Sequence, residues 1–189
     1  ECRSVVDAAG ELLFKETVSY VDGHKIAMFT YVFAGYQEFV QYKAFEYRGL
    51  CFVFNEDGTL FKRFIKLQKF FNLNEIDESN IINLPPNELP EIYEKADGSY
   101  ISISHDGKGK FVIASKGSLT SPQALKAREI WENKYSHKYL NDFPIQETLV
   151  FEIIYPENRI VVDYGDMEDL KLITGIGASG TEYNRTYLE

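Results

Sequence analysis

The stretch Glu94-Lys95-Ala96-Asp97-Gly98-Ser99 leads into a strand-like run over 100–104. It contains the pattern Lys-x-Asp-Gly. An uncharged lysine amine can attack phosphorus, and a glycine lets the backbone approach a ligand closely. The same residues are also typical of an ordinary surface turn. The pattern alone therefore leaves both interpretations open, and its neighbours must decide between them.

Strand signals dominate on both sides of this stretch. Segments rich in β-branched and aromatic residues alternate with turn signals such as Asn55-Glu56-Asp57-Gly58, which predicts antiparallel hairpins. The expected pairs are 50–54 with 60–65, 100–104 with 110–114 and 148–155 with 159–164, and further strands are expected over 25–33 and 170–174.

Helix signals are fewer. Ser121-Pro122 combines a capping hydroxyl with a first-turn proline and predicts a helix that continues to about Leu140. A shorter helix is expected over 36–42, and the proline-rich stretch 76–90 reads as a connection between two sheet-forming halves. Hairpins with helices packed outside them indicate an α+β domain with antiparallel sheets and flanking helices.

Composition narrows the class of protein. Hydrophobic residues make up 44% of the 189 residues and aromatic residues 15%, which is enough for a buried core. No apolar run approaches the roughly 18 residues that a membrane span needs. Cys2 and Cys51 are too few for a disulfide framework or a zinc site, and Cys51 sits in an apolar run as a small buried residue. We therefore expect a cytoplasmic protein without a membrane partner.

The charge of the chain argues against general binding of polyanions. The formal net charge is −9, so any contact with nucleic acid has to come through local basic patches. Two clusters could form such patches, although each by itself reads more simply as a solvated face. They are Lys62, Arg63, Lys66 and Lys69, and Lys108, Lys110 and Lys116.

Four further segments accompany the Lys-x-Asp-Gly pattern in a fixed order. They are Glu46-Tyr47-Arg48-Gly49, Lys69-Phe70-Phe71-Asn72, Ser115-Lys116-Gly117-Ser118 and Val150-Phe151-Glu152. Together with Lys-Ala-Asp-Gly, this set resembles the RNA ligase 1 family, the bacteriophage-type ATP-dependent ligases that repair cut tRNA. The resemblance runs from about Tyr31 to Tyr164, and it implies a nucleotidyltransferase (adenylation) fold.

The resemblance implies that Lys95 is the catalytic nucleophile, which forms lysyl-AMP from ATP before AMP passes to an RNA 5′-phosphate. A free lysine has a pKa near 10.4, so we expect cationic neighbours or partial burial to lower it. Lys69 and Lys116 are the candidate neighbours. ATP and Mg²⁺ are the implied cofactors, and RNA, in the family a tRNA with a broken strand, is the implied partner. Because Mg²⁺ usually keeps most of its waters, few direct protein ligands are expected, and the sequence does not identify them.

The family pattern extends to residues expected to bind the nucleotide, and each of them also has a plain structural interpretation. Arg48 would hold a phosphate or pair with Glu46, and Lys116 would contact a phosphate or be an ordinary hairpin lysine. Glu152, a carboxylate in an apolar strand, needs a partner such as a ribose hydroxyl, a metal-bound water or a cation. The complete predicted set is Tyr31, Arg48, Lys69, Phe71, Glu94, Asp97, Gly98, Lys116 and Glu152.

The less specific members of this set carry stronger alternatives. Tyr31 and Phe71 could belong to the apolar core, Glu94 would present only its backbone to adenine, and Asp97 could simply make an Asp-Gly turn. Gly98 is expected to let the backbone approach the nucleotide.

The chain departs from the family after Glu168, where no Lys-x-Lys pair is present and Lys171 is the one basic residue before Arg185. We therefore expect residues 1–189 to be a single adenylation domain that is truncated at both ends and lacks the family's C-terminal domain. Self-adenylation of this fragment could then be slow or absent. The alternatives are another lysine nucleotidyltransferase, either a DNA ligase or a capping guanylyltransferase, and a non-catalytic nucleotide- or RNA-binding module.

Overall fold

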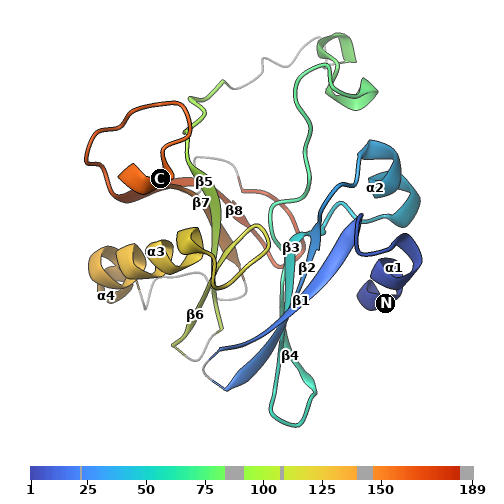
Figure 1. Cartoon of the computed structure of the whole chain (residues 1–189), viewed down its shortest axis with the longest axis horizontal. Coiled ribbons are helices and arrows are strands. Elements are labelled where there is room, and N and C mark those ends of the chain that lie inside the picture. The colour runs from blue at the N-terminus through green and yellow to red at the C-terminus, as the bar shows by residue number, and fades with distance from the viewer. Residues whose placement is uncertain (22, 84–91, 107–108, 140–146, 184–189) are drawn as a thin grey trace.

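A computed structural model describes residues 1–21, 23–83, 92–106, 109–139 and 147–183 (Figure 1). The strands are β1 (Phe14–Val21), β2 (His24–Tyr31), β3 (Arg48–Phe54), β4 (Leu60–Phe64), β5 (Ser99–His105), β6 (Phe111–Ser115), β7 (Thr148–Ile154) and β8 (Asp169–Ile176). The α-helices are α1 (Cys2–Ala9), α2 (Tyr36–Tyr42), α3 (Pro122–Ile130) and α4 (Ser136–Tyr139). A π-helical segment, Trp131–Tyr135, joins α3 to α4, and short 3₁₀ turns cover Asp77–Ser79, Ile81–Asn83 and Pro156–Asn158.

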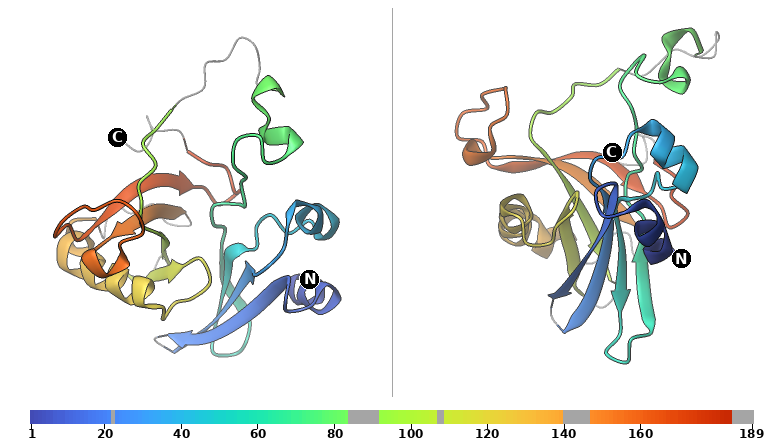
Figure 2. Two further views of the ribbon diagram at one scale, coloured as in Figure 1. Left: turned by 45° about the horizontal axis from the view of Figure 1, so that its top comes forward. Right: turned by 45° about the vertical axis from the view of Figure 1, so that its right-hand side comes forward.

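The strands form two antiparallel four-stranded sheets. The first has the order β1-β2-β3-β4, and the second has the order β6-β5-β7-β8. Helices α1 and α2 lie beside the first sheet and α3 and α4 beside the second, as Figures 1 and 2 show. The described part of the chain is thus a mixed domain with sheets in the middle and helices outside, as the sequence indicates.

Alternation along each strand produces this layered arrangement, because successive side chains of a strand point to opposite faces. In β2, Ile26 and Met28 pack toward the second sheet, where they meet Val112 of β6. Their neighbour Phe29 packs on the other face, in the core shared with α1 and α2. A third core lies between the second sheet and the helix that contains Trp131.

Most expected elements are confirmed. The hairpins β3–β4 and β5–β6, helix α2 and strand β8 lie where the sequence predicts them. The helix that starts at Ser121 is also confirmed, and the Ser121 hydroxyl accepts the N–H of Ala124 as a cap. Helix α1 and strand β1 were not expected. The connection over 76–90 contains two 3₁₀ turns, and its part from 84 onward lies outside the described residues.

The prediction of a strand over 159–164 is wrong. This segment is an irregular loop, and β7 pairs with β8 instead. The cause is a contact between distant parts of the chain: the N–H groups of Val161 and Val162, which a strand would offer to a neighbour, both donate to the carboxylate of Asp97 at 2.7 Å.

The assignment of Lys66 to a solvated basic face is also wrong. Its side chain is 1% exposed and lies between the sheets, where Nζ donates to the Ser104 hydroxyl at 2.8 Å. Ser104 in turn shares a hydrogen bond of 2.8 Å with Thr148. Burial lowers the pKa of Lys66 to about 8 and raises the pKa of the adjacent, fully buried Cys51 thiol to about 11.

No helix in the described residues combines the length and the apolar character needed to cross a membrane.

Candidate functional site

Lys95 lies on the segment that enters β5, and its side chain is exposed to solvent. Two carboxylates share its surroundings. The positive charge of Lys95 lowers the pKa of Asp97 and opposes the rise in the pKa of Glu152. The proposed nucleophile therefore stands at an accessible point beside two acidic groups that come from different strands or loops.

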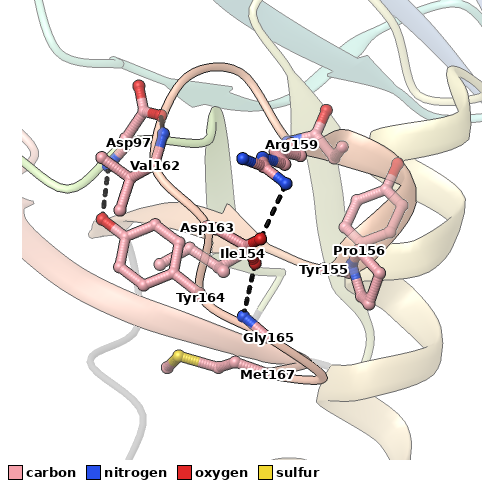
Figure 3. A pocket seen from close by; sticks show the side chains of 11 residues that line it. Asp97, Ile154, Tyr155, Pro156, Arg159, Val162, Asp163, Tyr164, Gly165 and Met167 are labelled. Atoms are coloured by element: carbon pink, nitrogen blue, oxygen red, sulfur yellow. Dashed lines mark hydrogen bonds and ion pairs between the residues drawn. The ribbon is translucent and has the colours of Figure 1, made fainter.

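Asp97 fastens the loop 159–165 to the segment that carries Lys95. Its carboxylate accepts the N–H groups of Val161 and Val162. Its own N–H donates to the Tyr164 hydroxyl at 3.1 Å (Figure 3). The pKa of Asp97 is lowered because the two loop N–H groups stabilise the ionised form. Within the described residues, the Asp97 carboxylate thus contacts protein backbone, and its function is that of a clamp.

The loop held by Asp97 borders a small cavity of about 140 Å³. Figure 3 shows Arg159 reaching across this loop to Asp163, with which it forms an ion pair of 2.7 Å. Of the site residues predicted from sequence, only Asp97 lines this cavity. Because its arginine is already paired, the cavity offers no uncompensated positive charge to an anion.

Gly98 is required by close approach of protein backbone. A Cβ at this position would lie 2.2 Å from the carbonyl oxygen of Ile153, far inside any allowed contact. The N–H of Gly98 donates to Glu152 Oε1 at 3.1 Å. The expectation that this glycine makes room for a nucleotide is thus corrected: its missing side chain lets the nucleophile segment lie against β7.

Glu152 stands in β7 opposite Tyr100 of β5 and Lys171 of β8. Partial burial raises its pKa, while the hydrogen bond from Gly98 and the charges of Lys95 and Arg48 act in the opposite direction. The partner that the structure gives this carboxylate is the Gly98 N–H, which is none of the partners expected from the sequence.

Arg48 begins β3, and its guanidinium lies between two aromatic rings. The guanidinium carbon is 4.6 Å from the centre of the Phe70 ring and 5.0 Å from that of Tyr100. One amino group donates to the Gln68 carbonyl at 3.3 Å, whereas the buried Nε has no hydrogen-bond partner in the described part of the chain. A planar cation held this way keeps a donor available for an anion.

Lys116 and Tyr31 meet beside Arg48. The Nζ of Lys116 lies 4.1 Å from the centre of the Tyr31 ring, a cation–π distance. The backbone of Lys116 also presses on Gly49, where a Cβ would lie 2.9 Å from the Lys116 carbonyl oxygen and where φ is +95°. This contact explains why a glycine follows Arg48, and it brings the end of β6 to the start of β3.

Lys69 and Phe71 form a separate local pair. The Nζ of Lys69 lies 4.0 Å from the centre of the Phe71 ring and donates to the Phe70 carbonyl. Phe71 packs edge-on against Tyr36 and Phe39 of α2, so it belongs to the core beside the first sheet. The plain core interpretation of Phe71 thus holds in the described residues. Lys69 is joined to Arg48 through their shared neighbour Phe70.

The predicted residues therefore divide into two adjoining groups. Lys95, Asp97, Gly98, Glu152 and Arg48 interact through hydrogen bonds or charge, and Lys116, Tyr31 and Lys69 adjoin Arg48 through its chain neighbours. Glu94 is exposed on the same segment as Lys95.

Three aromatic residues of the site were missed from the sequence. Tyr100 and Phe70 hold the Arg48 guanidinium, and Tyr164 receives the Asp97 N–H. Burial raises the pKa of Tyr100 to about 12, so this ring stays uncharged beside the cation. The one signal in the sequence was position: Tyr100 directly follows the segment 94–99, and Phe70 lies inside the segment 69–72.

Comparison with known proteins agrees with this geometry. A family model described as RNA ligase, of the T4 RNA ligase 1 type, matches residues 46–186, which is more than half of the chain. The chain belongs to the RNA ligase 1 family. The part that matches the RNA ligase model includes every predicted site residue except Tyr31, and it spans strands of both sheets.

The residues of this RNA ligase domain suit an anionic nucleotide better than a metal held by protein alone. Arg48 Nε is a buried donor without a partner in the described residues, and Lys116 and Lys69 add positive charge nearby. Among the same described residues, no three His, Cys, Asp or Glu side chains are close enough to hold a metal ion. Such a site fits Mg²⁺ that arrives with a triphosphate and keeps its waters.

Proposed function

We propose that this protein is an ATP-dependent RNA ligase that joins an RNA 5′-phosphate to a 3′-hydroxyl through lysyl-AMP at Lys95. The observation that carries the proposal is that the charges of Lys95 and Arg48 both act on the Glu152 carboxylate, in a chain of the RNA ligase 1 family. The family contributes the class of reaction, and the electrostatic interactions of Glu152 with Lys95 and Arg48 support the assignment of the nucleophile.

In the first step, the uncharged Lys95 amine attacks the α-phosphorus of ATP. An N–P bond forms, the bond between the α-phosphorus and the bridging oxygen breaks, and pyrophosphate leaves with the electron pair of that bond. The amine gives up its proton before or during attack, and the partly buried Glu152 carboxylate, whose pKa is raised, is the nearby group suited to accept it.

Arg48 is proposed to bind the α-phosphate. The rings of Phe70 and Tyr100 fix the plane of the guanidinium, so little side-chain freedom is lost when the phosphate binds. Lys116 and Lys69 would balance the remaining negative charge, and bound Mg²⁺ would supply further charge neutralisation on the phosphates.

The second and third steps use the same position. The RNA 5′-phosphate displaces Lys95 from AMP, and a 3′-hydroxyl then displaces AMP from the activated phosphate. Each is an exchange at phosphorus in which one P–O bond forms while a P–N or P–O bond breaks. Because Lys95 is exposed, an RNA end can reach it from solvent. Repair of a broken tRNA is the proposed setting.

The experiment is incubation with ATP and Mg²⁺ followed by intact-mass measurement and peptide mapping. The protein is expressed as residues 1–189 and as the whole product of its gene. We expect the mass of one AMP to be added at Lys95, no addition in Lys95→Ala, and full addition in the matched variant Lys15→Ala, which changes another exposed lysine. Addition from GTP in place of ATP would indicate a capping enzyme, and no addition in either form of the protein would indicate a binding module.

A further inference from the structure

A second hollow lies far from Lys95, between the start of β6 and the helix that follows Ser121. Its volume is about 330 Å³, within the range of small-molecule sites. Lys110, Arg128 and His137 line it together with Phe111 and Trp131, and among the residues that the structure describes the one carboxylate in its lining is that of Glu132. In a chain with a net charge of −9, this is a local reversal toward positive charge.

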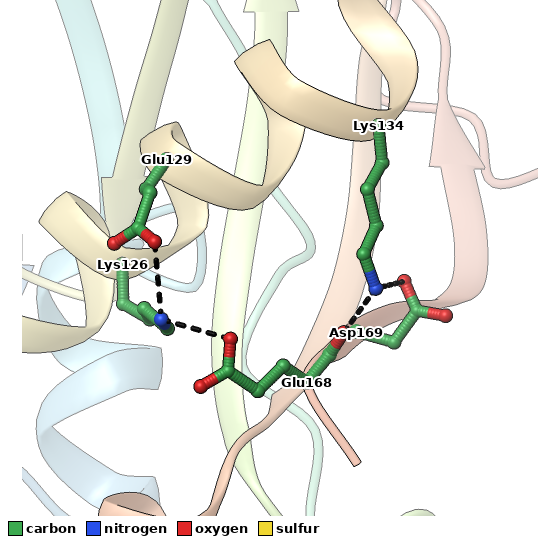
Figure 4. Close-up of polar contacts among 5 residues, drawn as sticks. All are labelled: Lys126, Glu129, Lys134, Glu168 and Asp169. Carbon is green, nitrogen blue, oxygen red and sulfur yellow. Dashed lines mark hydrogen bonds and ion pairs between the residues drawn. The ribbon is translucent and has the colours of Figure 1, made fainter.

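Arg128 and His137, which line this hollow, differ from two lysines of the same helical segment. Figure 4 shows Lys126 bound to Glu129 and Glu168, and Lys134 bound to the Glu168 carbonyl and beside Asp169. Arg128, between them in sequence, makes no hydrogen bond or ion pair with any residue that the structure describes, and the same holds for His137. Arg128 is half-buried in the lining, so its charge is held at the hollow, where the Glu132 carboxylate also lies.

One wall of the hollow offers an aromatic ring. Phe111 is half-buried in the lining, whereas Trp131 behind it is 3% exposed and belongs to the core, with its ring centre 5.1 Å from that of Phe111. Trp131 begins the π-helical segment, and such segments occur frequently at functional sites. A cationic group beside an accessible aromatic ring, here Arg128 beside Phe111, is what single-stranded nucleic acid requires, because a phosphate meets the cation and a base stacks on the ring.

We propose that this hollow binds a phosphate and base of the single-stranded RNA substrate at a distance from the reacting end. The inference rests on the proposed function in that RNA is the ligand. In the β5–β6 hairpin, His105 stands opposite Phe111 and Ile101 opposite Ser115, so the hollow lies at the end of the hairpin away from Lys95. The length of β5 places the two sites roughly 20 Å apart.

This separation makes the proposal testable by RNA length. At about 3.4 Å per stacked nucleotide, roughly six nucleotides are needed to reach from one site to the other. A 12-nucleotide RNA with a 5′-phosphate can occupy both sites, whereas a dinucleotide with a 5′-phosphate occupies one.

The measurement is fluorescence anisotropy with both RNAs and the chain as printed, over a range of salt concentrations. In Arg128→Ala, we expect about tenfold weaker binding of the 12-mer, the effect of losing a charged hydrogen-bonding group. The salt slope should fall by about 0.7 for each phosphate that the variant no longer neutralises, while binding of the dinucleotide is unchanged. Lys110→Ala, a change at an exposed side chain, should also weaken binding of the 12-mer. This second variant keeps the inference testable if Arg128→Ala does not fold.

Lys126→Ala is the matched control, because Lys126 is on the same helix but already paired. The inference is overturned if wild type, Arg128→Ala and Lys110→Ala bind the 12-mer equally well. It is also overturned if Lys126→Ala loses as much affinity for the 12-mer as Arg128→Ala, or if Arg128→Ala loses as much affinity for the dinucleotide as for the 12-mer. AMP attachment at Lys95 is measured in parallel and should be unaffected by Arg128→Ala. If AMP is attached but RNA binding does not depend on Arg128, the proposed function stands and the second site is refuted. If RNA binding depends on Arg128 but no AMP is attached, the second site stands and the proposed function is refuted.

Discussion

The buried Lys66 allows a quantitative test of the electrostatics between the two sheets. Its pKa falls from 10.5 to about 8 because burial disfavours the charged ammonium. Such a drop corresponds to about 3 kcal/mol of folding free energy lost at pH 7. Replacing Lys66 with methionine removes this cost but also removes the hydrogen bond to Ser104, worth about 1 kcal/mol. Lys66→Met should therefore stabilise the protein by about 2 kcal/mol at pH 7.

The dependence on pH has a definite sign. Because the pKa of Lys66 is lower in the folded state, the unfolded chain binds more protons between pH 8 and 10.5, and wild-type stability rises with pH over that window. The advantage of Lys66→Met should accordingly shrink by about 2 kcal/mol between pH 7 and pH 10.

The assay is urea unfolding of wild type and Lys66→Met at a series of pH values, because the difference between them cancels the titrating groups that do not interact with Lys66. The Cys51 thiol, whose pKa burial raises and the charge of Lys66 lowers, is the exception. Lys15→Met, at an exposed position, is the control and should change stability by less than about 0.5 kcal/mol at every pH. A Lys66→Met variant that is less stable than wild type at pH 7, or a difference that does not vary with pH, would refute the reasoning.

Three further outcomes are expected. Gly98→Ala should destabilise the protein by about 1–3 kcal/mol in urea unfolding and lower AMP attachment, because its Cβ would meet the Ile153 carbonyl, whereas Gly35→Ala, which meets only the end of the Glu38 side chain, should do neither. Asp97→Ala should speed amide hydrogen exchange at Val161 and Val162; in wild type the same loosening should appear as pH falls through the lowered pKa of Asp97, and unchanged exchange would contradict the clamp. Arg48→Lys should slow AMP attachment by about 10²-fold, because the planar guanidinium between Phe70 and Tyr100 is lost. Arg63→Lys, at an exposed arginine, should leave the rate of attachment unchanged.

Local patterns in the sequence were sufficient for much of the fold. The turn at 55–58 predicts the β3–β4 hairpin, and Ser121-Pro122 predicts the start of α3, because in both cases the signal lies inside the element itself. The strand expected over 159–164 failed for the opposite reason. Its backbone donors are taken by Asp97, a residue more than sixty positions away, and no local pattern reports such a contact.

The site shows the same division. Lys95, Arg48 and Glu152 could be selected from ordered sequence patterns, and the structure brings them into one neighbourhood of charge. The partners that hold them could not be selected, since Tyr100 and Phe70 resemble many other aromatic residues in a chain with 13 tyrosines and 14 phenylalanines.

Two predictions fail because charge and size do not report burial. The basic run around Lys66 predicts an exposed side chain, yet this side chain turns between the sheets to Ser104. Gly98 is expected to serve a ligand, yet the space beside it is filled by the Ile153 carbonyl. Both errors concern contacts between segments that lie far apart in the sequence, which only the assembled sheets define.

The central claim is that Lys95 becomes attached to AMP, and peptide mapping after incubation with ATP and Mg²⁺ tests it most directly. The account predicts that AMP is found on the peptide containing Lys95 and that Lys95→Ala, shown to be folded by its unfolding curve, carries none. AMP on Lys69, Lys116 or any other lysine, or no AMP on the folded product of the whole gene, would contradict it.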